Sequence, residues 1–326
     1  MIVRDTLFID GKWVRPQGQG RLEVTDSSTG KPWASIPEGN ADDAQGAVAA
    51  ARRAFAGWAG MTPAARGEVL DRVAAELKSR ADELARAIAT EVGMPLKMAS
   101  RVQVAGPVAA WSAYAKMAGN FEFEQRVGNS LVVREPVGVV GAITPWNFPL
   151  NQITLKVAAA MAAGCTVVLK PSEVAPINAF ILAEAIEAAG VPAGVFNLVT
   201  GLGPVVGEAI AGHPDVDMVS FTGSTRAGRR VGELAAQGIR KVALELGGKS
   251  ASVVLDDTDE GPDAVRVFLT PESARQFASR SNRVIAAGRP SCPLCGEPLD
   301  PDGHICVRMN GYRRGALLGP GDDVDE

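Results

Sequence analysis

Two side chains suited to carbonyl chemistry follow apolar segments of this sequence. Glu245 comes directly after an apolar run and precedes two glycines, so we expect its carboxylate to be poorly solvated and to hold a proton readily. Such a carboxylate can act as a general base, or it can cap neighbouring backbone amides. Asn147 lies in the proline-rich turn 145–149, which would aim its amide. A preorganised donor of this kind stabilises an oxyanion by about 3 to 4 kcal/mol, whereas a lone turn asparagine is more often structural.

A second set of residues is suited to an anion and a sugar. Ser224 follows an apolar segment and opens a predicted helix, so its hydroxyl and the first free amides form an anion site. That role is compatible with ordinary N-capping. Lys170 and Glu173 flank a Pro-Ser turn at the end of another apolar segment, where a ribose would lie. Two such charges form a solvated ion pair by default.

A glycine-rich turn at 201–207 enters a further predicted helix. The spacing of Gly201, Gly203 and Gly207 is one residue longer than the standard dinucleotide fingerprint. Alone, these glycines could equally serve a tight turn and close helix packing. The turn therefore indicates a nucleotide only in combination with the other motifs.

Alternating strands and helices must position these residues. Apolar segments at 137–143, 166–169, 195–199, 218–221 and 241–244 predict strands, and 150–163, 177–189, 204–211 and 227–237 predict helices between them. This alternation predicts an α/β fold with a parallel sheet that is covered on both faces. Ligands bind beyond the carboxyl ends of the strands in such sheets, and the residues above follow those ends.

The first third of the chain is predicted to be mostly helical. A strand pair at 7–14 turns at Asp10-Gly11, and helices follow at 41–59, 63–79, 81–92 and 98–117, each with an apolar face that predicts core packing. Residues 121–133 alternate around Gly128-Asn129, which predicts a protruding hairpin.

Four segments in order along the chain resemble the aldehyde dehydrogenase superfamily. They are Pro145-Trp146-Asn147-Phe148-Pro149, Lys170-Pro171-Ser172-Glu173, Phe221-Thr222-Gly223-Ser224-Thr225 and Leu244-Glu245-Leu246-Gly247-Gly248-Lys249. The resemblance runs from about residue 7 to 257. It implies a Rossmann-type domain over 1–257, with a subunit-joining hairpin at 118–135, that binds NAD for oxidation of an aldehyde to a carboxylic acid. The family shares the departure of the glycine-rich turn from the usual fingerprint.

The resemblance also implies a role for each matching residue. Glu245 would be the general base and Asn147 the oxyanion donor, with Lys156 near the active site. Lys170 and Glu173 would bind the adenosine ribose hydroxyls, and the Glu173 carboxylate would repel a 2′-phosphate, which favours NAD over NADP. The remaining positions assigned to the cofactor are Ile143, Thr144, Trp146, Ser172, Gly203, Gly207, Phe221, Thr222, Gly223, Ser224, Leu246 and Gly247.

The cysteine nucleophile that the family uses has no match in this sequence. Cys165 belongs to the start of a predicted buried strand, and Cys292 lies too far from Glu245 and in a different context. Because a thiolate must attack the aldehyde carbonyl, we expect a truncated dehydrogenase with little or no turnover. Its small-molecule partner, if it is active, would be an aldehyde. The uncovered hairpin and interdomain face would favour association, including homo-oligomers.

A cysteine-rich tail follows an acidic joint at 258–264. Cys292, Cys295, His304 and Cys306 are spaced as in a zinc knuckle, with free thiols as the alternative. Residues 265–314 resemble the C-terminus of an uncharacterised bacterial protein family, and the acidic end 315–326 is expected to be disordered. Alternative functions are therefore a zinc-stabilised binding or regulatory protein and a non-functional fusion that retains dinucleotide binding.

Composition limits the remaining classes of function. The 326 residues are 46% hydrophobic and 21% charged, as in packed globular proteins, and the length predicts two domains or one large domain with an appendage. A net charge of −4 argues against nucleic acid and anionic membranes as partners. The N-terminus has no secretory pattern, and the apolar run 157–169 is too short to span a bilayer. We expect a cytoplasmic protein.

Overall fold

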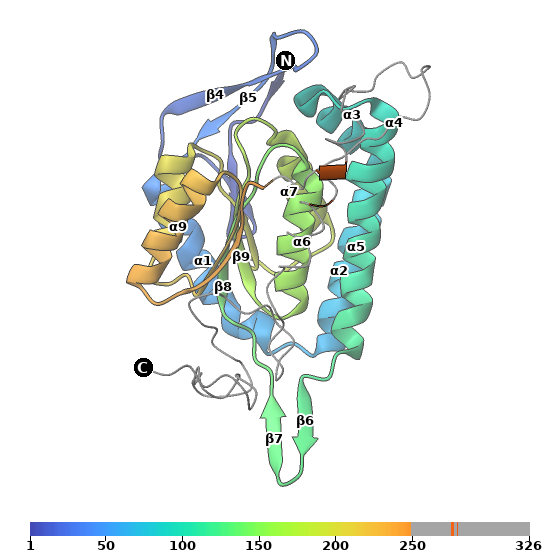
Figure 1. Ribbon diagram of the computed structural model, residues 1–326, viewed down its shortest axis with the longest axis vertical. Helices are drawn as coiled ribbons and strands as arrows, with labels where there is room; N and C mark the ends of the chain where they lie inside the picture. Colours follow the sequence, from blue (N-terminus) through green and yellow to red (C-terminus); the bar gives the residue numbers. More distant parts are fainter. Residues whose placement is uncertain (249–274, 277–278, 280–326) are drawn as a thin grey trace. The chain divides into compact units, whose positions relative to one another are not determined.

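A mixed seven-stranded sheet forms the centre of the fold (Figure 1). A computed structural model describes residues 1–248 together with 275, 276 and 279, and all structural statements concern these residues. The strands are β2 (Leu7–Ile9), β3 (Lys12–Val14), β8 (Val139–Ile143), β9 (Thr166–Lys170), β10 (Phe196–Leu198), β11 (Met218–Thr222) and β12 (Lys241–Glu245).

The order of these strands is β12-β11-β8-β9-β10-β2-β3. The first five strands in that order run parallel, which confirms the predicted parallel sheet. The predicted N-terminal strand pair, β2 and β3, extends the same sheet, because β2 pairs antiparallel with β10. The sheet is therefore mixed rather than purely parallel.

The helices agree with the predicted ones to within a few residues, except that two π-helical stretches interrupt them. In η1 and η2 the regular α-helical pattern is replaced by wider turns, which are frequent at functional sites. The elements are α1 (Ala41–Ala59), α2 (Pro63–Ser79), α3 (Ala81–Val92), α4 (Leu96–Met98), η1 (Ala99–Val104), α5 (Ala105–Asn120), α6 (Pro149–Ala162), α7 (Ile177–Ala188), η2 (Gly203–Gly207), α8 (Glu208–Gly212) and α9 (Thr225–Gln237).

Local sequence fixes where the first two long helices begin. The Asn40 side chain accepts hydrogen bonds from the backbone N–H groups of Asp42 and Asp43, and the Asp43 carboxylate accepts one from the Asn40 backbone at 2.9 Å. This reciprocal capping box satisfies donors that helix α1 cannot use itself. Helix α2 starts after the N-cap Thr62 with Pro63 in its first turn, where a missing N–H costs nothing.

The sheet separates two apolar clusters. In β9, Val168 belongs to the cluster with α1, α8 and α9, whereas Val167 and Leu169 belong to the cluster with α2, α5, α6 and α7. This alternation follows from the two-residue period of a strand. Figure 1 shows α1 and α9 on one side of the sheet and α6 and α7 on the other, with α2 and α5 beyond them.

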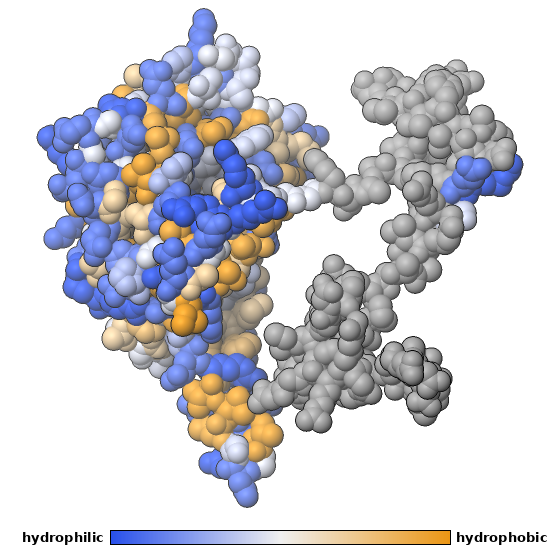
Figure 2. All heavy atoms as spheres, turned by 60° about the vertical axis from the view of Figure 1, so that its left-hand side comes forward, coloured by the Kyte–Doolittle hydropathy of each residue, from blue (hydrophilic) through white to orange (hydrophobic). Residues whose placement is uncertain are grey.

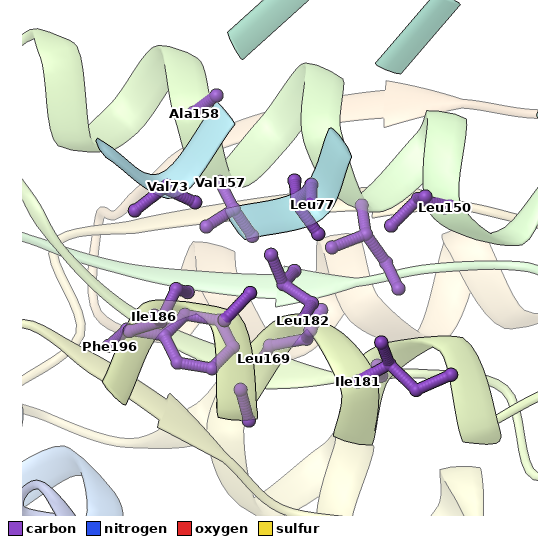
Figure 3. Packing of buried hydrophobic residues seen from close by; sticks show 14 of the residues in the cluster. Val73, Leu77, Leu150, Val157, Ala158, Leu169, Ile181, Leu182, Ile186 and Phe196 are labelled. Carbon is purple, nitrogen blue, oxygen red and sulfur yellow. The ribbon is translucent and has the colours of Figure 1, made fainter. Parts of the chain in front are cut away.

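The larger cluster joins helices to the sheet through interlocking aliphatic side chains. Figure 3 shows Leu77 from α2, Val157 from α6 and Leu182 from α7 gathered near Leu169 of β9, and all four are fully buried. Burying a side chain of this size contributes about 1.5 to 3 kcal/mol. This packing fixes β9, and with it the Lys170 side chain that ends the strand.

A buried carboxyl lies at the end of α3. Glu91 is 3% exposed, and its Oε1 accepts a hydrogen bond from the Ile177 backbone N–H at 2.9 Å, while its Oε2 has no partner among the described residues. Burial raises the pKa of Glu91 to about 8, against the smaller effect of that hydrogen bond. The contact holds the start of α7 to α3.

A second sheet near the N-terminus was not predicted. It comprises β1 (Ile2–Val3), β4 (Gly20–Thr25) and β5 (Pro32–Glu38), in the order β1-β5-β4. Pro32 and Pro37 both lie within β5. Proline cannot donate a hydrogen bond to a neighbouring strand and normally argues against a strand. The sequence pattern therefore did not predict β5.

The predicted hairpin is confirmed. It consists of β6 (Glu124–Val127) and β7 (Ser130–Val133), turns at Gly128 with φ +59°, and extends away from the body of the fold (Figure 1). Its strand residues are all exposed, including Val127 and Leu131 to Val133. Figure 2 shows these apolar side chains gathered at the lower end of the view. In the described part of the chain, no helix combines the length and apolarity needed to cross a membrane.

Candidate functional site

The predicted site residues meet in one cleft at the carboxyl ends of the parallel strands. Register places Ile143 of β8 beside Lys170 of β9, and Thr222 of β11 beside Glu245 of β12. The cleft has a volume of about 690 Å³. Both predicted catalytic residues and all predicted cofactor residues except Gly207 line it; the further lining residues are Pro145, Gln152, Ala227 and Gly248.

Lys170 and Glu173 form an ion pair within this cleft. The Lys170 Nζ lies 2.7 Å from the Glu173 Oε2, and the Lys170 side chain is only 3% exposed. Burial by itself would raise the pKa of the Glu173 carboxyl, but the charge and hydrogen bond of Lys170 outweigh it and hold the pKa below the ordinary value. The Lys170 end of the pair is therefore buried and the Glu173 end is partly exposed, whereas the sequence alone indicated a pair that is fully solvated.

Ser224 is the N-cap of α9. Its Oγ accepts a hydrogen bond from the Ala227 backbone N–H at 3.2 Å, as predicted for a capping residue. Gly223, just before it, has no room for a side chain, since a Cβ there would lie 2.6 Å from the Phe221 ring. Free amides at the N-terminus of a long helix bind anions, so this wall of the cleft can hold a pyrophosphate.

Asn147 is held at both its side chain and its backbone. Its Oδ1 accepts a hydrogen bond from the Phe148 backbone N–H at 3.0 Å, which leaves the Nδ2 group as the end free to donate. The carbonyl of Asn147 accepts a hydrogen bond at 3.2 Å from Nε2 of Gln103, a fully buried residue of η1. The Nδ2 group of Asn147 is thus available to donate, and its role as an oxyanion donor stays a prediction.

Glu245 does not have the poorly solvated environment that we expected. It is exposed, and its Oε2 accepts a hydrogen bond from the Thr222 Oγ1 at 3.0 Å. The reason lies in the sheet: β12 is the edge strand of the described sheet, paired only with β11, and Val242 and Leu244 of the same strand are also partly exposed. The apolar run 241–244 predicted that Glu245 would be buried, but a strand at the edge of the sheet leaves it exposed.

Lys156 lies close to the cleft on α6. Its Nζ donates a hydrogen bond to the Ser220 Oγ at 3.2 Å, and the side chain is half-buried between the helix and β11. Burial lowers the pKa of Lys156, and the nearby negative charge of Glu245 partly opposes that shift. A cation therefore faces the same region as the candidate base.

Two residues of functional interest were not identified from the sequence. Gln103 is 44 residues from Asn147 in the sequence but donates a hydrogen bond to its carbonyl. Gln152 lines the cleft, and its buried Oε1 has no hydrogen-bond partner among the described residues. The signal for Gln152 was a polar residue in the apolar segment 150–163. Thr144, which the sequence analysis assigned to the cofactor, likewise has a buried hydroxyl without a hydrogen-bond partner among the described residues.

A narrower slot of about 350 Å³ adjoins the cleft between η2 and α9. It shares Ile143, Gly203, Phe221 and Ala227 with the cleft, and it also contains Gly207. A Cβ at Gly203 would meet no atom within 4 Å, so the space in front of this glycine is open to a ligand. Together the cleft and the slot present a charged pair, Lys170 and Glu173, and apolar side chains such as Ile143 and Phe221 to a ligand.

The predicted zinc ligands Cys292, Cys295, His304 and Cys306 lie outside the described residues, as does Lys249. Within the described residues, no group of three or more potential ligands is placed to hold a metal. Cys165 is buried at the amino end of β9, opposite to the cleft, and burial raises its thiol pKa. It cannot serve as a nucleophile in this cleft.

Comparison with known proteins agrees with this geometry. The model of the aldehyde dehydrogenase family matches residues 13–283, beyond residue 257 where we expected the resemblance to stop. The chain is 51% identical over 253 residues, 77% of its length and 53% of the relative, to 3-succinoylsemialdehyde-pyridine dehydrogenase of a Pseudomonas species. It is 43% identical to a putative aldehyde dehydrogenase of Staphylococcus haemolyticus, again over 77% of this chain and 53% of the relative.

A solved structure has a similar fold. A mutant of aldehyde dehydrogenase C from Pseudomonas syringae, complexed with NAD⁺ and octanal, superimposes with a TM-score of 0.76 at 45% identity, over 78% of this chain and 53% of that one. The chain spans about half the length of the curated relatives that it matches. The chain belongs to the aldehyde dehydrogenase family.

Proposed function

We propose that this chain binds NAD in the cleft and contributes the oxyanion donor and general base of an NAD-dependent oxidation of an aldehyde to a carboxylic acid. The observation that supports this most strongly is that residues from four separated segments line a single cleft at the carboxyl ends of β8, β9, β11 and β12. Bound NAD would supply the hydride acceptor. The relatives' names refer to different aldehydes, so the proposal is limited to that class.

The cofactor residues fit a dinucleotide on physical grounds. The amino end of α9 at Ser224 suits a pyrophosphate, and the Lys170–Glu173 pair suits the hydroxyls of a ribose. Because the pKa of Glu173 is lowered, its carboxylate is charged at neutral pH and repels a 2′-phosphate. NAD is therefore favoured over NADP.

The catalytic residues would act on the carbonyl oxygen and on a proton. The free Nδ2 of Asn147 would donate a hydrogen bond to an aldehyde oxygen as it gains negative charge. Glu245, with one oxygen bonded to Thr222, keeps its other oxygen for a proton from the attacking nucleophile. A thiolate beside these two residues would complete the chemistry, and Cys165 does not lie there. Because no cysteine of this sequence matches the family's nucleophile in position and context, we expect cofactor binding without appreciable turnover by this chain alone.

Calorimetric titration of the full chain with NAD and with NADP tests this function. We expect saturable binding of NAD and weaker binding of NADP, with Glu173→Gln narrowing the difference between them. A matched control is Glu124→Gln, which changes an exposed carboxylate of the hairpin. Absence of any saturable heat with NAD would refute the proposed function. Metal analysis of the same protein would test the predicted zinc ligands of the tail.

A further inference from the structure

A second cavity, of about 470 Å³, lies between the β1-β5-β4 sheet and helices α3 and α7. It shares no lining residue with the cleft or with the slot between η2 and α9, so the proposed function leaves it unexplained. An apolar wall with a few charged groups is typical of a site for a small organic ligand. The apolar part of this wall consists of Ile2, Trp33, Ala87, Ile177 and Ile181, and the charged residues are Arg4, Arg80, Asp82, Glu83 and Arg86.

Two arginines at this cavity share one carboxylate. Nη1 of Arg4 and Nη1 of Arg80 each donate to a different oxygen of Glu184. The side chains of Arg4 and Arg80 are only 24% and 30% exposed. The next acidic group, Glu83, lies 3.9 Å from Arg80 and is 53% exposed, so solvent screens its charge. Among the described residues, this half-buried cluster therefore contains two cations and one close anion.

Two N–H donors at the same cavity lack an acceptor. Nε of Arg4 and Nε1 of Trp33 are shielded from water and have no hydrogen-bond partner among the described residues. Buried donors in folded proteins are nearly always paired, so both would gain from an acceptor that enters the cavity. The Arg4 guanidinium is also held in place by the Phe180 ring, whose centroid is 5.6 Å away. The cavity thus combines fixed donors with an excess of positive charge.

A carboxylate attached to an apolar group matches both features. Its oxygens only accept hydrogen bonds, and the bonds that cationic donors make to it are stronger than neutral ones. Its single charge balances the surplus cation, whereas a phosphate dianion would exceed that charge and would be repelled more strongly by Glu83. Asp82 and Arg86 form a separate exposed pair at 3.8 Å and leave this balance unchanged.

We propose that this cavity is a second binding site of the protein, for a small carboxylate with an apolar body. The carboxylate would accept hydrogen bonds from Arg4 and Trp33 and lie near Arg80, and the apolar body would pack against Ile177 and Ile181. The inference does not depend on the proposed binding of NAD, because the cavity and the cleft share no residue.

Titration of the full chain by ligand-observed NMR tests this site. The probes are benzoate and hexanoate, with benzamide as a neutral analogue of benzoate. We expect saturable binding of the carboxylates and about tenfold weaker binding of benzamide, which loses the charge-assisted hydrogen bonds. Saturating NAD should not displace benzoate, since NAD is proposed to bind in the cleft.

Two substitutions at the cavity should have opposite effects on benzoate. Trp33→Phe keeps the apolar wall but removes the indole N–H, and should weaken binding by about three- to tenfold. Its control is Trp13→Phe, because the Trp13 indole donates to Glu187 outside the cavity. Glu83→Gln removes a like charge and should strengthen binding by about twofold.

An exposed carboxylate of α2 supplies the control for Glu83→Gln. Glu68→Gln lies outside the cavity and should leave benzoate binding unchanged. Thermal unfolding of each variant checks that the fold is intact. A purely structural role of Glu83 would not give tighter binding when its charge is removed.

The outcomes separate this inference from the proposed function. Opposite effects of Trp33→Phe and Glu83→Gln on benzoate support the site. Failure of both benzoate and hexanoate to bind saturably, displacement of benzoate by NAD, or unchanged affinity in Trp33→Phe would overturn it. A chain that binds benzoate in this way but does not bind NAD would refute the proposed function and not this inference.

Discussion

The two sides of the cleft differ in how firmly the described residues hold them. On one side, β9 lies between β8 and β10, all of its residues are buried, and Lys170 is bonded to Glu173. On the other side, β12 is an edge strand with exposed residues, and among the described residues the Glu245 carboxylate has one hydrogen-bond partner, the Thr222 hydroxyl. The side with Lys170 and Glu173 is thus fixed by the core, whereas the candidate base is not enclosed.

This difference matters because the two tasks depend on the environment differently. A ribose site needs side chains at fixed positions, which a buried strand end provides. A general base gains from a poorly solvated setting that raises its affinity for a proton, and an exposed carboxylate lacks that setting. The described residues therefore suit binding better than catalysis.

The largest expected effect is on the pH dependence of stability, through the buried carboxyl of Glu91. Glu91 holds the Ile177 backbone, four residues beyond Glu173, and its pKa rises from 4.5 to about 8. The folded state therefore keeps a proton that the unfolded state releases. The contribution of Glu91 to the free energy of unfolding is therefore complete below about pH 4.5 and is lost above about pH 8. Between these values the free energy of unfolding falls by up to about 1.4 kcal/mol for each pH unit.

Glu91→Gln should remove this pH dependence, because glutamine keeps the acceptor for Ile177 and carries no charge to bury. In urea unfolding, the variant should match the wild type near pH 5 and exceed its stability by several kcal/mol near pH 8. Glu184→Gln, which alters a half-buried carboxylate paired with arginines, serves as the control. Parallel stability curves for wild type and Glu91→Gln would show that Glu91 does not bind the proton.

A bulky residue at Gly203 should abolish most cofactor binding without unfolding the protein. A Cβ at this position would stand in open space of the cleft. Gly203→Val should therefore obstruct a bound dinucleotide, at a cost of about 1 to 3 kcal/mol or roughly ten- to a hundredfold in Kd. Calorimetry with NAD measures the loss. Gly46→Val in α1 is the matched control, since a Cβ there also meets no atom within 4 Å but lies outside the cleft. Equal affinity in the two variants would contradict this assignment.

The sequence predicted the strand ends well because apolar runs and turn residues mark them locally. Lys170 and Ser224 were placed correctly because each follows such a run. The solvation of Glu245 was predicted wrongly, because burial of an edge strand depends on what covers it rather than on its own residues. The contact of Gln103 with Asn147 could not be predicted, since it joins η1 to a turn through three-dimensional packing alone.

A double-mutant cycle on Lys170→Met and Glu173→Gln should show a coupling of about 1 to 2 kcal/mol in unfolding free energy. A buried pair can be worth more, but the Glu173 side chain is 37% exposed, and solvent screens the interaction. Because the pKa of Glu173 is lowered, this contribution is present above its ordinary value of 4.5 and is lost as the pH falls through the folded value. The coupling should accordingly be larger at pH 7 than at pH 3.

The same cycle on Thr222→Val and Glu245→Gln should give the smallest effect, about 0.5 kcal/mol or less. The hydrogen bond between these side chains is exposed, so water replaces either partner at little cost. Urea unfolding at pH 7 measures both cycles under one condition. A coupling for this pair that equals or exceeds that of Lys170 and Glu173 would mean that the β11–β12 side is as firmly held as the β9 side. Glu245 would then have the rigid setting that a general base requires, and the contrast between the two sides of the cleft would be wrong.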